Sequence, residues 1–180
     1  MFAVSGESVR RALLAGIVTM TLSLSACSGD KPSLPEEKKT SAADKTAADE
    51  KALELLVADL WKVRTESQNT GNTSRVQFEG LLSPVLTEVE VARLQRYQKA
   101  KVLRKGAPKI TAIETSVSGS TGQILLCLDE DNWTAEEDGD PIDHTITGPK
   151  PWGATAERSP DGWTVTAEME TEIVRKKKAC

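Results

Sequence analysis

Residues 110–128 read ITAIETSVSGSTGQILLCL, and this stretch decides the fold class of the chain. Over residues 110–117 apolar and polar side chains alternate with a period of two, which is typical of a β-strand. Residues 119–122 contain two glycines and indicate a turn. Residues 123–128 form a short and nearly continuous apolar run. The stretch therefore predicts two antiparallel strands joined by a tight turn.

The clearest turn signal is Ser159-Pro160-Asp161-Gly162, which has proline at the second turn position and glycine where a positive φ is required. From Trp163 to Ile173, apolar side chains alternate with threonine and glutamate. This alternation predicts a strand with one buried and one solvent-facing side, and it places Glu168 on the solvent-facing side. We therefore expect the chain to end in a hairpin with a long final strand.

The segment between these two hairpins is acidic. Eight carboxylates and no lysine or arginine lie within residues 129–143. A calcium site would need six to eight oxygen ligands, but the EF-hand spacing fails because Trp133 stands where the third ligand should be. We interpret residues 129–141 as a solvated acidic loop that binds no metal, followed by a strand over residues 142–147.

Upstream of Pro108 the apolar period is that of a helix. One face of a first helix carries Leu53, Leu56, Val57, Leu60, Trp61 and Arg64. We expect this helix to fade in the polar run of residues 65–74. Ser83 followed by Pro84 predicts the cap and the first residue of another helix. Its stripe runs towards Leu103 through Val85, Leu86, Val89, Ala92, Leu94 and Tyr97.

The N-terminus has the layout of an export signal. Arg10 and Arg11 precede an uncharged apolar run, residues 12–24, whose 13 residues are fewer than the roughly 20 that span a membrane as a helix. The run ends in Leu24-Ser25-Ala26-Cys27, which resembles the bacterial lipobox. In that motif the cysteine receives the lipid and becomes the new N-terminus. An ordinary signal peptide with a chance cysteine, or a buried helix of the fold, is the alternative.

We therefore expect residues 1–26 to be a lipoprotein signal peptide and Cys27 to be acylated. Two or more acyl chains, such as palmitate, give stable anchoring to a membrane. Residues 28–49 contain serine, proline, lysine and acids, with Leu34 as their only large apolar side chain. Such a composition cannot form a packed core, so residues 27–49 are predicted to be a flexible tether. The folded domain is then expected over residues 50–180, outside the cytoplasm.

Helices followed by antiparallel strands predict an α+β fold, with the helices packed on a curved sheet of about four strands. This order looks like the NTF2-like (cystatin-like) fold. More narrowly, residues 50–180 resemble small secreted lipoproteins of actinobacteria that carry an NTF2-like domain. The resemblance rests on the lipobox, Trp61 in the first helix, the stretch from Cys127 to Trp133, the Asp161-Gly162-Trp163 hairpin and the terminal Cys180.

Three cysteines are an odd number for an exported chain. If Cys27 is acylated, Cys127 and Cys180 remain as a pair, and an oxidising compartment favours a disulfide between them. A nucleophilic or redox cysteine would need an activating base or a C-x-x-C motif, and neither is present in the sequence. We therefore expect a structural disulfide.

The net charge of −4 argues against nucleic acid as a partner. We expect a non-catalytic module without a cofactor that binds a small apolar ligand or a cell-envelope partner. Trp133, Trp152 and Tyr97 are the candidate contacts, because aromatic side chains are enriched at binding sites. The alternative is an enzyme resembling SnoaL or ketosteroid isomerase. An enzyme would bring at least two titrating groups into one concave apolar pocket, such as paired carboxylates or Tyr97 with an aspartate.

Overall fold

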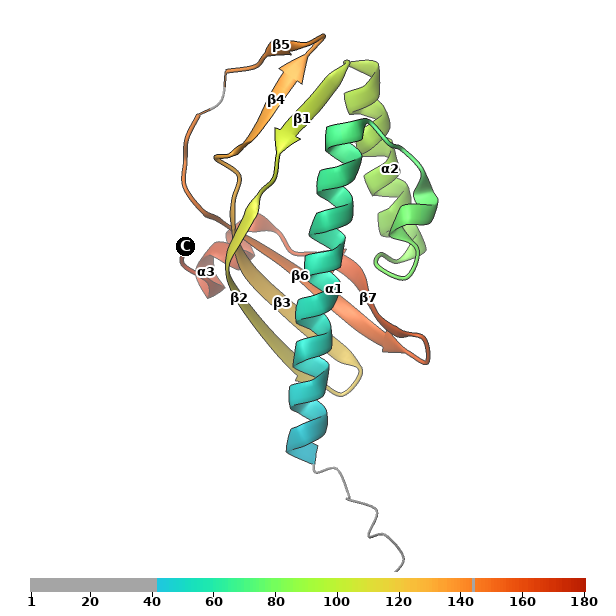
Figure 1. Cartoon of the computed structure of the whole chain (residues 1–180). Helices are drawn as coiled ribbons and strands as arrows, with labels where there is room; N and C mark the ends of the chain where they lie inside the picture. The colour runs from blue at the N-terminus through green and yellow to red at the C-terminus, as the bar shows by residue number, and fades with distance from the viewer. Residues whose placement is uncertain (1–41, 144) are drawn as a thin grey trace, which may run out of the picture. The chain divides into compact units, whose positions relative to one another are not determined.

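The computed structural model describes residues 42–143 and 145–180 (Figure 1). The predicted signal peptide, Cys27, the first part of the predicted tether and His144 lie outside the described residues. The elements in chain order are α1 (Ala42–Thr70), the 3-10 helix η1 (Arg75–Phe78), α2 (Pro84–Lys99), β1 (Val102–Gly106), β2 (Lys109–Ser118), β3 (Thr121–Asp129), β4 (Trp133–Glu137), β5 (Asp140–Pro141), β6 (Lys150–Ser159), β7 (Gly162–Glu168) and α3 (Thr171–Lys177).

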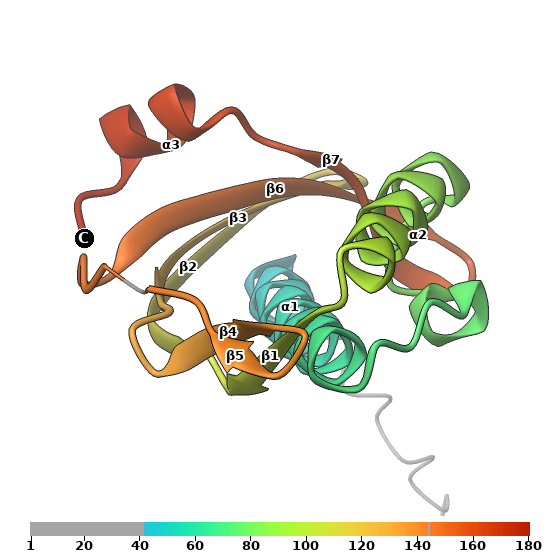
Figure 2. The same cartoon turned by 90° about the horizontal axis from the view of Figure 1, so that it is seen from above.

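The strands form two antiparallel sheets. The larger sheet has the order β2-β3-β6-β7 and the smaller one has the order β1-β4-β5. Seen from above, α1 lies inside the curve of the larger sheet and α3 lies on its outer side (Figure 2). The predicted α+β class, with helices on a curved sheet of four strands, is confirmed. Among the described residues, no helix is both long enough and apolar enough to cross a membrane.

The core lies between α1 and the inner face of the larger sheet. Ile124, Leu126 and Leu128 of β3 project to this side and pack with buried residues of α1. Gly122 allows the helix to approach the sheet closely, because a Cβ atom there would stand only 2.6 Å from Cδ1 of Leu53. Glycine is therefore needed at this position for the packing of α1, although its backbone φ is not positive.

The outer face of the larger sheet is covered by α3. Val174 is fully buried and lies against Gly153, where an added Cβ would stand 2.9 Å from a Val174 methyl. This cover explains why residues 124–128 are apolar without alternation, since both faces of β3 are buried there. The prediction of one strand over residues 163–173 is wrong at its end, because β7 stops at Glu168 and the chain turns back as α3.

A disulfide joins Cys127, on the outer face of β3, to Cys180, which follows α3 in the chain. The two Cα atoms are 5.7 Å apart. Lys178 reinforces this attachment. Its side chain is 7% exposed and its Nζ lies 2.5 Å from a carboxylate oxygen of Glu114 on β2. The last residues of the chain are thus fixed to the sheet at two points.

The first helix is longer at both ends than the sequence suggests. It begins at Ala42, within the predicted tether, and the side chains of residues 42–48 are exposed. It also continues through the polar run to Thr70. The hydroxyls of Thr65, Ser67 and Thr70 each donate to the carbonyl four residues earlier, at 2.6–2.7 Å. These bonds satisfy the polar side chains without ending the helix.

The helix predicted to run towards Leu103 ends at Lys99, and the residues that follow form β1. Its partner β4 lies within the predicted acidic loop, so that interpretation is also wrong. The two strands pair along an antiparallel ladder, and ion pairs flank it, with Lys105 bound to Glu136 at 2.6 Å and, just beyond the strand ends, Lys101 bound to Asp138 at 2.7 Å. Residues 142–147 are not a strand in their described part, and β6 begins later, at Lys150. The Ser83 cap with Pro84 is confirmed.

The disulfide gives a direct test of how the C-terminal end is held. We expect a Cys127→Ala/Cys180→Ala variant to lose about 4 kcal/mol of unfolding free energy, because the bridge closes a loop of roughly 50 residues. Urea unfolding of the Cys27→Ser chain, with and without this change, measures the difference. A thiol assay on the denatured Cys27→Ser chain should find no free thiol. Two free thiols, or equal stability of the two chains, would contradict the bridge.

Candidate functional site

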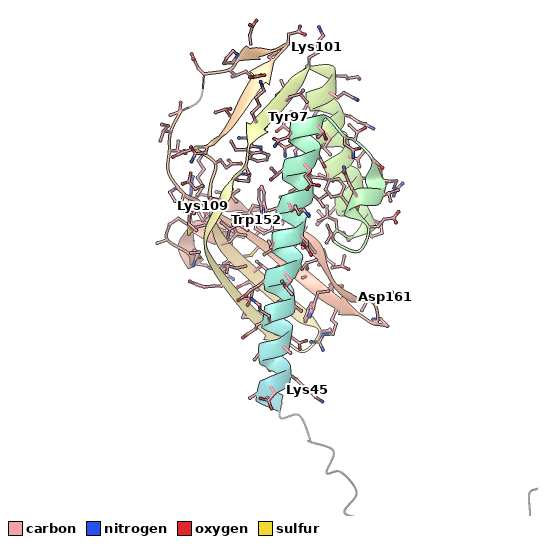
Figure 3. The ribbon with its side chains drawn as sticks, in the orientation of Figure 1. Lys45, Tyr97, Lys101, Lys109, Trp152 and Asp161 are labelled. Atoms are coloured by element: carbon pink, nitrogen blue, oxygen red, sulfur yellow. A yellow bond between two sulfur atoms is a disulfide. The ribbon has the colours of Figure 1, made fainter. Side chains whose placement is uncertain are left out.

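The centre of the site is one turn of α1 that carries Trp61 and Arg64. The Arg64 guanidinium lies 5.2 Å from the ring centre of Trp61 and 5.7 Å from that of Trp152. Trp61 meets both Trp152 and Trp133 edge to face, with ring centres 5.7 and 6.4 Å apart. We call Trp61, Trp133 and Trp152 the tryptophan cluster. Figure 3 labels Trp152, which lies between the sheet and α1.

Arg64 is only 2% exposed, so its charge must be neutralised inside the protein. Its Nη2 atom lies 3.0 Å from Oε2 of Glu90 on α2 and also contacts Oε1 of Glu168 on β7. The other Glu90 oxygen pairs with Arg93. We call Arg64, Glu90, Arg93 and Glu168 the charged cluster. It joins α1, α2 and the last residue of β7.

The inward face of α2 overlaps only in part with its predicted apolar stripe, because Leu86 and Leu94 pack on the core but Glu90 is buried as well. The buried residues of α2 are Thr87, Glu90 and Leu94. Val85 and Val89 of the predicted stripe are 73% and 59% exposed. The buried charge of Arg64 accounts for this orientation, since a helix that buried Val85 and Val89 would turn Glu90 away from it.

A β-bulge directs Glu168 to the same place. The register of β6 and β7 shifts between Thr155 and Ala156, so that Glu168 pairs with Ala154, whose side chain belongs to the buried core. Bulges commonly redirect a side chain in this way. Glu168 is exposed, as predicted, with 37% of its side chain accessible, but the bulge also brings it into contact with Arg64.

The electrostatics of the arginines follow from their surroundings. Burial lowers the pKa of Arg93, but the charge of Glu90 and the hydrogen bond to it leave this pKa raised overall. Burial lowers the pKa of Arg104, whose guanidinium lies 3.6 Å from the ring centre of Trp133. Both Glu90 oxygens are occupied by guanidinium groups, which makes this carboxylate a charge partner rather than a free base.

Two cavities open on the surface around this turn of α1. The first, which we call the apolar groove, has a volume of about 480 Å³ and lies between α1 and the start of β2. Ala58, Trp61, Pro108 and Ile110 give it an apolar lining. The exposed residues Lys62, Glu66 and Lys109 flank this lining. The second, the charged cavity, has a volume of about 240 Å³ and is lined by the charged cluster with Leu86, Val89 and Arg96.

The structure brings only part of the predicted site together. Trp133 is 1% exposed, and its Nε1 donates to Asn69 at 3.0 Å. Trp152 is half-buried beside Trp61, whereas Tyr97 lies on α2 with 36% of its surface exposed. None of these three lines the apolar groove. Sequence reasoning missed the charged cluster, although an arginine within the apolar stripe of the first helix was a usable signal.

Among residues 42–143 and 145–180, no group of three histidine, cysteine or acidic side chains has the geometry to hold a metal ion. Three acidic side chains in or beside the smaller sheet pair with lysine or arginine: Glu130 with Arg104 at 3.4 Å, Glu136 with Lys105 and Asp138 with Lys101. The chemistry that this region offers is therefore that of aromatic surfaces and paired charges.

Comparison with known proteins finds similarity in backbone only. No protein-family model matches the chain, and no curated protein matches it. The intermembrane space region of the chloroplast protein ARC6 is 12% identical, with a TM-score of 0.44, over 67% of this chain and 95% of that chain. A protein of the NTF2-like family from Streptomyces avermitilis is 13% identical, with a TM-score of 0.43, over 67% and 93% of the two chains.

The Kfla4162 protein from Kribbella flavida is 15% identical, with a TM-score of 0.44, and the match covers 74% of this chain and 99% of that chain. These similarities assign no role to any residue of this chain.

The two carboxylates of the charged cluster should differ sharply in their effect on stability. We expect Glu90→Gln to cost about 3 kcal/mol of unfolding free energy, because it removes the buried partner of Arg64. Glu168→Gln should cost at most about 1 kcal/mol, because that side chain is more than one-third exposed and solvent screens its ion pair. Urea unfolding of the two variants measures both values, and equal losses would contradict this division.

Proposed function

We propose that the chain is a non-catalytic binding module outside the cytoplasm, anchored to the cell membrane by a lipid on Cys27. Its apolar groove takes a small apolar ligand or an apolar side chain of a cell-envelope partner. The observation that carries this proposal is the groove of about 480 Å³, in which Trp61 forms part of an apolar lining.

The groove has the chemistry of a binding site for apolar groups. Its apolar lining comes from two different elements, α1 and the start of β2, so a ligand would be held from two sides. Removal of apolar surface from water contributes about 25 cal/mol per Å², and concave apolar sites are where small ligands bind. Lys62 and Lys109 beside the groove would favour a ligand that also carries a negative group.

The charged cluster bears on the choice between binding and catalysis. It does bring two carboxylates to one cavity, which is the feature that favours an enzyme. However, Glu90 and Glu168 both pair with Arg64, and Glu90 pairs with Arg93 as well. A general base needs a free lone pair within reach of the substrate proton. The double pairing of Glu90 supports a structural role for that carboxylate, which leaves the cavity without a second carboxylate free for catalysis and favours a binding module.

The proposed location rests on the export signal, the lipobox and the cysteine pair. A disulfide between Cys127 and Cys180 persists in oxidising compartments and is rare in the cytosol. The helical start of α1 at Ala42 leaves residues 28–41 as the segment between the lipid and the described domain.

The anchor is tested by changing the cysteine to which we expect the lipid to be attached. We expect the wild-type chain, expressed in a bacterium with lipoprotein processing, to incorporate radiolabelled palmitate and to fractionate with membranes. Cys27→Ser should incorporate no label and should leave the membrane fraction. Cys180→Ser is the matched control, because it removes a different sulfur and should retain the label. Labelling of Cys27→Ser, or absence of label from the wild type, would contradict the anchor.

The groove is tested with an uncharged apolar dye, N-phenyl-1-naphthylamine. We expect the dye to bind the wild-type chain and to quench tryptophan fluorescence, since Trp61 lines the groove. Ala58→Glu places a charge in the lining and should weaken dye binding about tenfold, which corresponds to roughly 1.4 kcal/mol. Ala92→Glu makes the same change at an exposed alanine of α2 and should leave binding unchanged. Equal affinities for both variants would place the dye elsewhere.

A further inference from the structure

The charged cavity has a different lining from the apolar groove. Three guanidinium groups, from Arg64, Arg93 and Arg96, and two carboxylates line it. The Nε atoms of Arg64 and Arg93 are buried and have no hydrogen-bond partner in the described part of the chain. We propose that this cavity is a second site, independent of the groove, which binds a small carboxylate that carries a short aliphatic chain.

The sign of the ligand charge follows from the lining. Three positive groups against two negative groups leave the cavity with one excess positive charge. Arg96 supplies that excess, because it is exposed and forms no ion pair with any described residue. A guanidinium binds a carboxylate through two parallel hydrogen bonds, and such a bond is stronger than one between neutral groups. Arg96 is therefore the first contact for an incoming anion.

The carboxylate of Glu168 lies beside Arg64, in the position that the carboxylate of the ligand would take. Glu90 is held by two arginines and is 4% exposed, whereas Glu168 contacts Arg64 alone and is 37% exposed. Glu168 is also the last residue of β7, so its side chain can turn to solvent without moving the strand. The ligand thus exchanges with Glu168, and Glu90 keeps Arg64 neutralised during the exchange.

Leu86 and Val89 indicate that the part of the ligand beyond its carboxylate is apolar. Val89 is 59% exposed although it is apolar, and it lines the cavity together with half-buried Leu86. An aliphatic chain on the ligand would cover this surface. The cavity has a volume of about 240 Å³ and is therefore small. A branched carboxylate of five carbons is a compact ligand that carries both the anionic group and the aliphatic chain.

The probe is 3-methylbutyrate, titrated calorimetrically into the purified full chain at low ionic strength. Its neutral isostere 3-methylbutyramide and inorganic phosphate serve as comparison ligands. We expect the carboxylate to bind at least tenfold more tightly than the amide, because only the carboxylate complements the excess charge. We also expect it to bind more tightly than phosphate, which has no aliphatic group. Equal binding of carboxylate and amide, or tighter binding of phosphate, overturns the proposal.

Two variants test the assigned contacts, and two more serve as controls. Arg96→Gln should weaken binding of 3-methylbutyrate about tenfold, whereas Lys99→Gln, the same change of charge on the same helix outside the cavity, should not alter it. Glu168→Gln should strengthen binding about threefold, because the competing carboxylate becomes neutral. Equal effects of Arg96→Gln and Lys99→Gln, or weaker binding by Glu168→Gln, overturn the proposal. Ala58→Glu should leave this binding intact, so failure of the groove and failure of this site are separate results.

Discussion

A single buried positive charge, that of Arg64, constrains much of this structure. An unpaired charge in a protein interior costs several kcal/mol, so the residues around Arg64 must supply negative partners. Glu90 comes from α2 and Glu168 comes from a bulged end of β7, while Trp61 and Trp152 lie against the guanidinium. These two ion pairs therefore connect α1 to α2 and to the end of β7.

This constraint also shapes the surfaces that are available for binding. Because α2 turns Glu90 inward, Val89 of the same helix remains exposed to solvent and borders the charged cavity. Trp61, in the same helical turn as Arg64, lines the apolar groove between α1 and β2. One turn of α1 thus contributes to two cavities of opposite chemistry. On the outer face of the sheet, α3 and the disulfide bury what would otherwise be an exposed apolar surface.

Local sequence signals predicted the elements that depend on neighbouring residues. The α+β order, the Ser83 cap and the turn at residues 159–162 follow from periodicity and turn chemistry, and the structure has all three. The smaller sheet was missed because β1 pairs with β4, a segment far away in the sequence, as in the pairing of Gly106 with Trp133. The inward face of α2 and the bulge before Glu168 were missed because a distant charge on α1 determines them. The apolar groove could not be predicted from local signals either, because residues of α1 and of β2 line it together.

Arg64 and Glu90 are energetically coupled as a buried pair in the folded protein. A double-mutant cycle tests this coupling most directly, with urea unfolding of Arg64→Met, Glu90→Gln and the double variant. Each single change should destabilise strongly, and the double variant should lose about 2–3 kcal/mol less than the sum of the two losses, as expected for a buried interacting pair. Additive losses, with a coupling free energy below about 0.5 kcal/mol, would contradict the claim.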